Sequence, residues 1–315
     1  MTLEEIAKEL SLAPCPRVPS WAFGTVQRRS ITFASGFCDA LTRVVWVQSH
    51  GMSGDIRVHP QRPALTKSSK LADLSLGEMV LLASVEGGVA ATSWADGVMG
   101  WNDWIGFQVY DKYPEPGLMQ RIGDCMIEFA PSGIYVEDWR FQPSNPGVLA
   151  GLHLVSETGH GGETVARRGG LVVAGDHAIC SLARRNELPD GVRAQDYVRA
   201  SSTPAAALEH VFECCVSYAS RANGAFRIAL STDPRCEGTT ADFTDDFAIA
   251  PQANHVVQKI SDDPAVASRL WQIDSLEGSV VFPLATEVAA DRLAWLQTES
   301  DSLVDPVRIS LRSNT

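Results

Sequence analysis

One alternating segment carries the residue best suited to acid–base chemistry. Residues 134–140 read Ile-Tyr-Val-Glu-Asp-Trp-Arg. Because successive side chains of a strand point to opposite faces, Tyr135, Glu137 and Trp139 would share one face. If that face is interior, Glu137 is a half-buried carboxyl that holds its proton more tightly than in water. Such a group is suited to proton transfer or to binding a basic group.

A second alternating segment, residues 43–50, would place Trp46 and Gln48 on one face of its strand. A buried glutamine costs on the order of a few kcal/mol unless it is hydrogen-bonded, so Gln48 belongs either to a structural network or to the floor of a pocket. His50 ends the segment and would act as an acid or base if it reached the same pocket. His153, later in the chain, is a further candidate for ligand contact.

Arg57 offers two interpretations. It shares a strand face with Asp55 and His59, from which its guanidinium could capture a ligand carboxylate. It could equally balance Glu137, since a salt bridge from Glu137 to Arg57 or Arg43 would give these residues a purely structural role.

Three tryptophans lie close together in the sequence: Trp94, Trp101 and Trp104. Their rings are large enough to wall a cavity for an apolar or aromatic ligand. The alternative is ordinary core packing, which tryptophan serves in many barrel interiors.

Motifs of other chemistries are missing from the sequence. It contains no HExxH or paired-cysteine spacing for a metal, no glycine-rich phosphate loop and no GxSxG nucleophile elbow. The segment around His160, Gly-His-Gly-Gly, is typical of a turn between strands. The sequence therefore predicts neither a metal nor a cofactor.

Composition narrows the range of partners. The net charge of −12 and the pI near 5.0 disfavour nucleic acid and anionic lipid. We expect no membrane span, because no apolar run approaches ~20 residues, and the N-terminus does not read as a secretory signal. The seven scattered cysteines are expected to be reduced, which predicts a cytoplasmic location. A homodimer is compatible with the sequence.

The pattern along the chain is mainly that of strands. Thr2 and Glu5 form a capping box that predicts a short N-terminal helix ending before Pro14. Within residues 71–86, apolar side chains recur at helical spacing, which predicts one inserted helix. Short alternating segments separated by Gly, Pro and Asp-Gly fill most of the remainder, including an expected last strand at 307–311. This is typical of an antiparallel sandwich or barrel.

Residues 186–206, rich in turn-forming residues, are expected to be a long loop or a seam between two regions, and a strand is expected from His210 to Tyr218. We therefore divide the chain into an N-terminal barrel region, 1–185, and a C-terminal β-rich region, 186–315. The two regions could also form one continuous two-lobed unit or a pair of related barrels.

Several segments together resemble a group of uncharacterised bacterial proteins with a lipocalin-like, calycin-type β-barrel. They are Thr42-Arg-Val-Val-Trp-Val-Gln48, Gly54-Asp-Ile-Arg-Val58, Leu74-Ser-Leu-Gly-Glu-Met-Val-Leu-Leu-Ala83, Tyr135-Val-Glu-Asp-Trp-Arg140, Val172-Val-Ala-Gly-Asp176 and Ser231-Thr-Asp-Pro-Arg-Cys-Glu-Gly238. The resemblance spans about residues 40 to 275. It implies the barrel fold and a pocket, and it implies no particular reaction or ligand.

Two functions follow as hypotheses. In the first, the barrel binds a small apolar or aromatic molecule in a cavity. The expected contacts are Trp46, Gln48, Arg57, Trp94, Trp101, Tyr135, Trp139 and His153. In the second, the protein is a cofactor-independent isomerase, lyase or hydrolase. Glu137 or a nearby histidine (His50, His59 or His153) would move a proton, and Arg57 or Tyr135 would stabilise developing charge. A closed salt-bridge network in a filled interior would instead indicate an interaction module.

Overall fold

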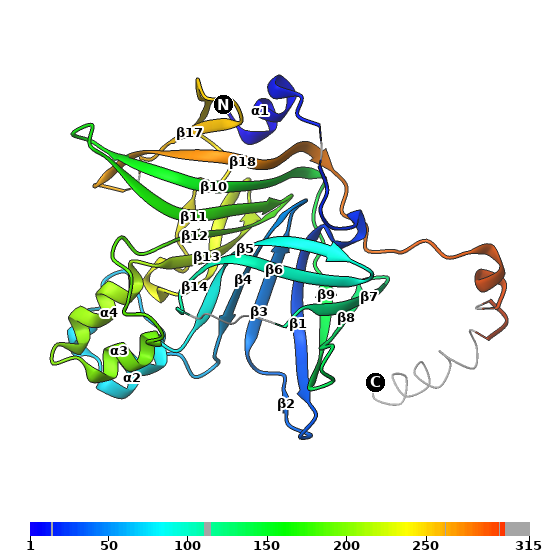
Figure 1. The fold of residues 1–315 in the computed structure, drawn as a ribbon, viewed down its shortest axis with the longest axis horizontal. Helices are drawn as coiled ribbons and strands as arrows, with labels where there is room; N and C mark the ends of the chain where they lie inside the picture. The colour runs from blue at the N-terminus through cyan, green and yellow to red at the C-terminus, as the bar shows by residue number, and fades with distance from the viewer. Residues whose placement is uncertain (14, 110–114, 262, 296, 300–315) are drawn as a thin grey trace. The chain divides into compact units, whose positions relative to one another are not determined.

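The computed structural model describes residues 1–13, 15–109, 115–261, 263–295 and 297–299 (Figure 1). Its contacts separate two units, Met1–Leu284 and Ala285–Thr315. Within the second unit, residues 290–295 and 297–299 are helical. The strand expected at 307–311 lies outside the described residues.

The first sheet is a closed antiparallel β-barrel, so the expected fold class is confirmed. Its eight main strands follow one another in chain order, and β1 closes the ring by pairing with β9 as well as β3. The short β2 pairs only with the end of β1. The strands are β1 (Gly24–Phe33), β2 (Cys38–Asp39), β3 (Arg43–Gln48), β4 (Met52–Val58), β5 (Glu86–Ala95), β6 (Val98–Gly106), β7 (Gly117–Ile122), β8 (Cys125–Phe129) and β9 (Tyr135–Phe141).

The second sheet is an open antiparallel half-barrel in the order β15-β14-β13-β12-β11-β10-β18-β17-β16. The strands are β10 (Gly147–Gly159), β11 (Thr164–Ala174), β12 (His177–Leu182), β13 (Cys215–Ala222), β14 (Ala225–Ser231), β15 (Thr240–Ala241), β16 (Phe247–Ile249), β17 (His255–Lys259) and β18 (Val266–Val280). The sheet changes between β9 and β10, and the expected boundary at 185 falls after β12.

The half-barrel packs against the outside of the barrel, where β11, β12 and β13 contact β3 to β6 (Figure 1). Strands at this junction are buried on both faces, which explains the unbroken apolar run Leu171-Val-Val-Ala174. The two sheets approach so closely that a Cβ at Gly54 would lie 2.7 Å from the Ile179 side chain. Position 54 therefore has room only for glycine.

The two helices expected from the sequence are present. Helix α1 (Leu3–Leu10) begins with the capping box of Thr2 and Glu5 and buries Leu3 and Ile6 beside β18. The inserted segment is shorter than 71–86. It comprises a 3₁₀ turn, η2 (Leu71–Asp73), and helix α2 (Leu76–Leu82), because Ser75 caps a new helix and β5 already begins at Glu86.

The long loop or seam expected at 186–206 is wrong for its second half, where α3 (Ala194–Ala200) lies and α4 (Pro204–Phe212) begins, whereas residues 186–193 are not helical. Pro204 stands in the first turn of α4, where a missing N–H costs nothing. The strand expected from His210 begins only at Cys215. The three helices α2, α3 and α4 pack together at one side of the sheets (Figure 1).

Two further 3₁₀ turns, η1 (Ser20–Ala22) and η3 (Pro234–Cys236), complete the elements named above. In the described part of the chain, no helix has the length and apolar character needed to cross a membrane.

Candidate ligand-binding site

The barrel interior contains a cavity of about 370 Å³. This volume suits a small organic molecule. Its lining comes from the inward faces of β1, β3, β4, β6, β8 and β9, together with Glu115. The lining residues are Ile31, Phe33, Trp46, Ser53, Asp55, Arg57, Trp101, Trp104, Glu115, Glu128, Tyr135, Glu137 and Trp139.

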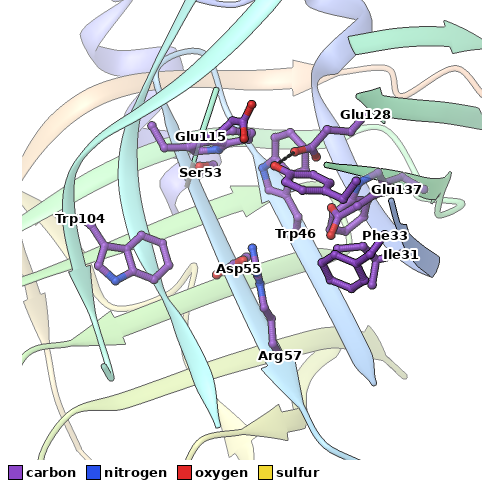
Figure 2. A pocket seen from close by; sticks show the side chains of 13 residues that line it. Ile31, Phe33, Trp46, Ser53, Asp55, Arg57, Trp104, Glu115, Glu128 and Glu137 are labelled. Carbon is purple, nitrogen blue, oxygen red and sulfur yellow. Dashed lines mark hydrogen bonds and ion pairs between the residues drawn. The ribbon is translucent and has the colours of Figure 1, made fainter. Parts of the chain in front are cut away.

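Aromatic rings form much of the wall. The Trp46 ring meets Trp101 and Trp139 edge to face, at centroid distances of 5.7 and 5.6 Å. Phe33 and Tyr135 meet in the same way at 6.4 Å. Such contacts fix the rings relative to one another. The wall is therefore held in shape by its own packing, with Trp104 facing the cavity from the other side (Figure 2).

Glu137 points into the barrel, as its strand pattern predicts, and is 4% exposed. Its carboxylate accepts a 2.6 Å hydrogen bond from Arg28, whose side chain is only 6% exposed. Arg28 lies 3.4 Å from Asp39 as well. The partner of Glu137 in its ion pair is thus Arg28, rather than Arg57 or Arg43.

Arg57 also lines the cavity, but its guanidinium is already engaged. Its Nε donates to Asp55 at 2.8 Å, and a terminal nitrogen lies 3.9 Å from the Glu86 carboxylate. Both acids come from neighbouring inward positions of β4 and β5. Arg57 is therefore a weaker candidate for capturing a ligand carboxylate than its sequence position suggested.

Glu128 is the most unusual group in the cavity, and it is not among the site residues predicted from the sequence. It stands directly opposite Glu137 in the β8–β9 pairing and is 4% exposed. Burial and, after it, repulsion from Glu137 together raise the pKa of Glu128 to about 8. Its carboxyl accepts a 3.3 Å hydrogen bond from the Tyr135 hydroxyl. At neutral pH, Glu128 is therefore mainly protonated.

Tyr135 remains a neutral donor under the same conditions. Burial raises the pKa of its phenol, and the charges of Glu128 and Glu137 add to that effect. The phenol can therefore donate one hydrogen bond either to Glu128 or to a bound molecule.

Six of the ten residues expected at the site line this cavity: Trp46, Arg57, Trp101, Tyr135, Glu137 and Trp139. Gln48 does not. It is buried in a hydrogen-bond network. Its side-chain oxygen accepts a hydrogen bond from the Trp46 indole at 3.2 Å, and its side-chain nitrogen donates one to the Thr92 hydroxyl at 2.9 Å. Gln48 thus orients a wall residue. Trp94 packs against Trp21 at 5.4 Å and also lies outside the lining.

The two histidines lie elsewhere. His50 Nε2 is 3.0 Å from Glu277 of β18, and its ring packs on Phe23. His153, on β10, borders a separate cavity of about 250 Å³ beside Asp103 and Arg168. Burial lowers the pKa of His153. Neither histidine lines the barrel cavity, so the geometry does not join either of them to Glu137.

The signal for Glu128 was present in the sequence. The turn residues Pro131, Ser132 and Gly133 lie midway between Glu128 and Glu137, and a hairpin about this turn places the two carboxyls opposite each other. Arg28 gave no comparable signal, because its contact depends on the closure of the barrel between β1 and β9.

Fold and site together define an eight-strand antiparallel barrel, extended by a half-barrel, with an aromatic and acidic cavity inside the barrel. The sequence matches no known protein-family model and no curated protein. Among solved structures, the chain is similar to the uncharacterized protein YLR301w from Saccharomyces cerevisiae. The two are 11% identical, the match covers 80% of this chain and 98% of that chain, and the TM-score is 0.44.

Proposed function

We propose that this protein binds a small apolar or aromatic molecule in the barrel cavity, as calycin-type barrels do. The observation that carries the proposal is the aromatic-walled space of about 370 Å³. Up-and-down eight-strand barrels of this kind have interiors of the right width to hold one small ligand. The chain-order meander of β1 and β3 to β9 supports the same class.

The wall supplies the affinity and the polar groups supply the orientation. A ligand entering the cavity would bury apolar surface against the rings of Trp46, Trp101 and Trp139. Polar ligand atoms would meet Glu128, Glu137 or the Tyr135 hydroxyl. Because the rings already pack on one another, little ordering of the wall is needed on binding.

A thermal-shift screen of apolar acids, aldehydes, aromatics and amines tests the proposal. A molecule that binds only the folded state raises its apparent stability with concentration. The Trp101→Leu variant should lose that shift, whereas Trp94→Leu, a matched change outside the cavity lining, should keep it. Loss of the shift in both variants, or the absence of any hit, would contradict binding in the barrel.

One observation favours a second function, that of a cofactor-independent isomerase, lyase or hydrolase. A carboxyl with a pKa near 8 beside a phenol, inside a cavity, is suited to general acid–base catalysis near neutral pH. Glu128 fits this role better than Glu137, which is ion-paired to Arg28. If the protein is an enzyme, Glu128→Gln should lower turnover by about 10²-fold or more and leave the fold intact. A binding protein should change mainly in affinity.

We also propose a cytoplasmic location, which is supported by the free thiols of all seven cysteines. A homodimer stays a prediction, and light scattering of the purified protein tests it.

A further inference from the structure

We propose that the ligand of the barrel cavity carries a positively charged nitrogen, an amine or a quaternary ammonium group, on an apolar or aromatic body. This inference rests on the proposed binding function and narrows it to one chemical class. Two features of the cavity carry it: an excess of carboxyl groups and a wall of tryptophan rings.

The charges that line the cavity are predominantly acidic. Four carboxyl residues contribute to the lining, namely Asp55, Glu115, Glu128 and Glu137. Against them stand Arg57 in the lining and Arg28 on Glu137. With Glu128 protonated, three carboxylates still face two guanidinium groups. A cationic ligand would offset this excess, whereas a ligand carboxylate would add to it.

The carboxyl oxygens also have hydrogen-bonding capacity left over. Asp55 Oδ1 is buried without a hydrogen-bond partner in the described parts of the chain, while Oδ2 binds Arg57. Glu128 receives its phenol hydrogen bond at the long distance of 3.3 Å. A buried acceptor without a donor is costly, and a protonated amine brings up to three donors. Asp55 and Glu128 are therefore suited to receive such a group.

The rings favour a cation as well. Tryptophan faces attract ammonium groups more strongly than those of tyrosine or phenylalanine, and the attraction increases where water is excluded. Trp46, Trp101, Trp104 and Trp139 all line this one cavity, together with Tyr135. A cage of rings with carboxyls beside it is the arrangement that recognises quaternary ammonium groups.

Binding of a cation would be linked to the proton on Glu128. A positive charge beside this carboxyl favours its ionised form, so binding near neutral pH should release a proton. The affinity for a permanent cation should therefore rise as the pH increases through about 8 and level off above it. This linkage gives a readout that an uncharged apolar ligand would not produce.

The experiment uses three matched probes on the full chain: benzyltrimethylammonium, its uncharged isostere neopentylbenzene, and phenylacetate. Isothermal titration should show the cation binding about tenfold or more tightly than the isostere, with phenylacetate weakest. If the isostere binds as tightly as the cation, the inference is wrong and the proposed apolar binding function stands. If no probe binds and the thermal-shift screen gives no hit, both fail.

Glu128→Gln removes the ionisable group and keeps the side-chain size. It should weaken binding of benzyltrimethylammonium at pH 9 by about tenfold and remove its pH dependence, and it should affect neopentylbenzene binding much less. The matched control is Glu209→Gln. Glu209 is an exposed carboxyl on α4 that pairs with Arg235, and its replacement should leave the binding of all three probes unchanged. If Glu128→Gln fails to fold, the pH series on the unaltered protein decides, because affinity independent of pH from 6 to 9 contradicts the inference.

Discussion

Two buried glutamates, one in each sheet, have opposite environments. Glu157 in the half-barrel is 1% exposed and lies within 3.0 Å of three guanidinium groups, those of Arg167, Arg185 and Arg269. Burial would raise its pKa, but the hydrogen bond and charge of Arg167, followed by Arg269, hold the pKa of Glu157 below its ordinary value. Glu128 in the barrel has its pKa raised instead.

The difference separates a structural carboxyl from an available one. Glu157 is the centre of a closed ion-pair network that joins β10, β11 and β18. Glu128 faces a cavity and a like-charged neighbour, and the favourable interactions of its carboxyl with Arg57, Tyr135 and Trp139 do not offset its burial. Buried charges normally carry complete sets of partners, so the incomplete set at Glu128 is the feature that indicates function.

The largest effect is expected from Glu157→Gln. The change removes the negative charge on which three guanidinium groups converge and leaves Arg167, 8% exposed at its side chain, without an anionic partner. Breaking a buried ion pair in this way should lower the free energy of unfolding by about 3–5 kcal/mol. Urea denaturation measures the loss. The exposed pair Glu209–Arg235 provides the control, since Glu209→Gln should cost about 1 kcal/mol or less. Equal losses in the two variants would show that burial among three guanidinium groups gives Glu157 no special structural role.

A smaller loss is expected from Arg28→Gln in the barrel. Arg28 and Glu137 form a pair at 2.6 Å with both side chains 6% exposed, so the variant should lose about 2–4 kcal/mol. Unlike Glu157, however, Glu137 borders a cavity that another cation can enter. Benzyltrimethylammonium should therefore raise the melting temperature of this variant more than that of the unaltered protein. An equal or smaller rise would show that ligand charge is not felt at Glu137.

The sequence predicted those parts of the site that depend on one strand. Alternation placed Tyr135, Glu137 and Trp139 on one inward face, and the structure agrees. Contacts between strands were harder to foresee. The sequence offered two arginines as partners for Glu137, and the actual partner, Arg28, meets it only where the first and last barrel strands close the ring.

Helices α3 and α4 were missed for a related reason. Their segment contains Pro204 and the pair Ser201-Ser202, which are as common in loops as at helix starts. Their helical state depends on packing with α2, to which a turn pattern gives no clue. His50 and His153 likewise lie outside the cavity, because the pattern of one strand does not reveal which sheet or cavity a histidine will face.

The pH dependence of the free energy of unfolding should reveal the raised pKa of Glu128. Because the pKa of Glu128 rises from 4.5 to about 8 on folding, the native state binds the extra proton between these values. Its contribution is fully present below about pH 4.5 and is lost as the pH rises to about 8. Relative to the unaltered protein, Glu128→Gln should therefore gain stability from about pH 5 to about pH 8 and show little further gain above pH 8. Urea midpoints at several pH values measure this, and parallel curves would contradict the raised pKa.

The smallest effect is expected from Arg185→Ala, which tests whether the network around Glu157 has partners to spare. The Arg185 side chain is 47% exposed, and without it Glu157 keeps Arg167 and Arg269. An exposed pair of this kind contributes about 0.5 kcal/mol or less. Arg167→Ala should cost about 2–3 kcal/mol, because Arg167 also donates to the carbonyls of Ala183 and Glu213, at 2.9 Å each. Urea denaturation of both variants measures the ratio. If Arg185→Ala costs as much as Arg167→Ala, then Glu157 needs all three of its cations. Glu128, whose pKa stays raised despite Arg57, Tyr135 and Trp139, would then contrast with Glu157 even more sharply.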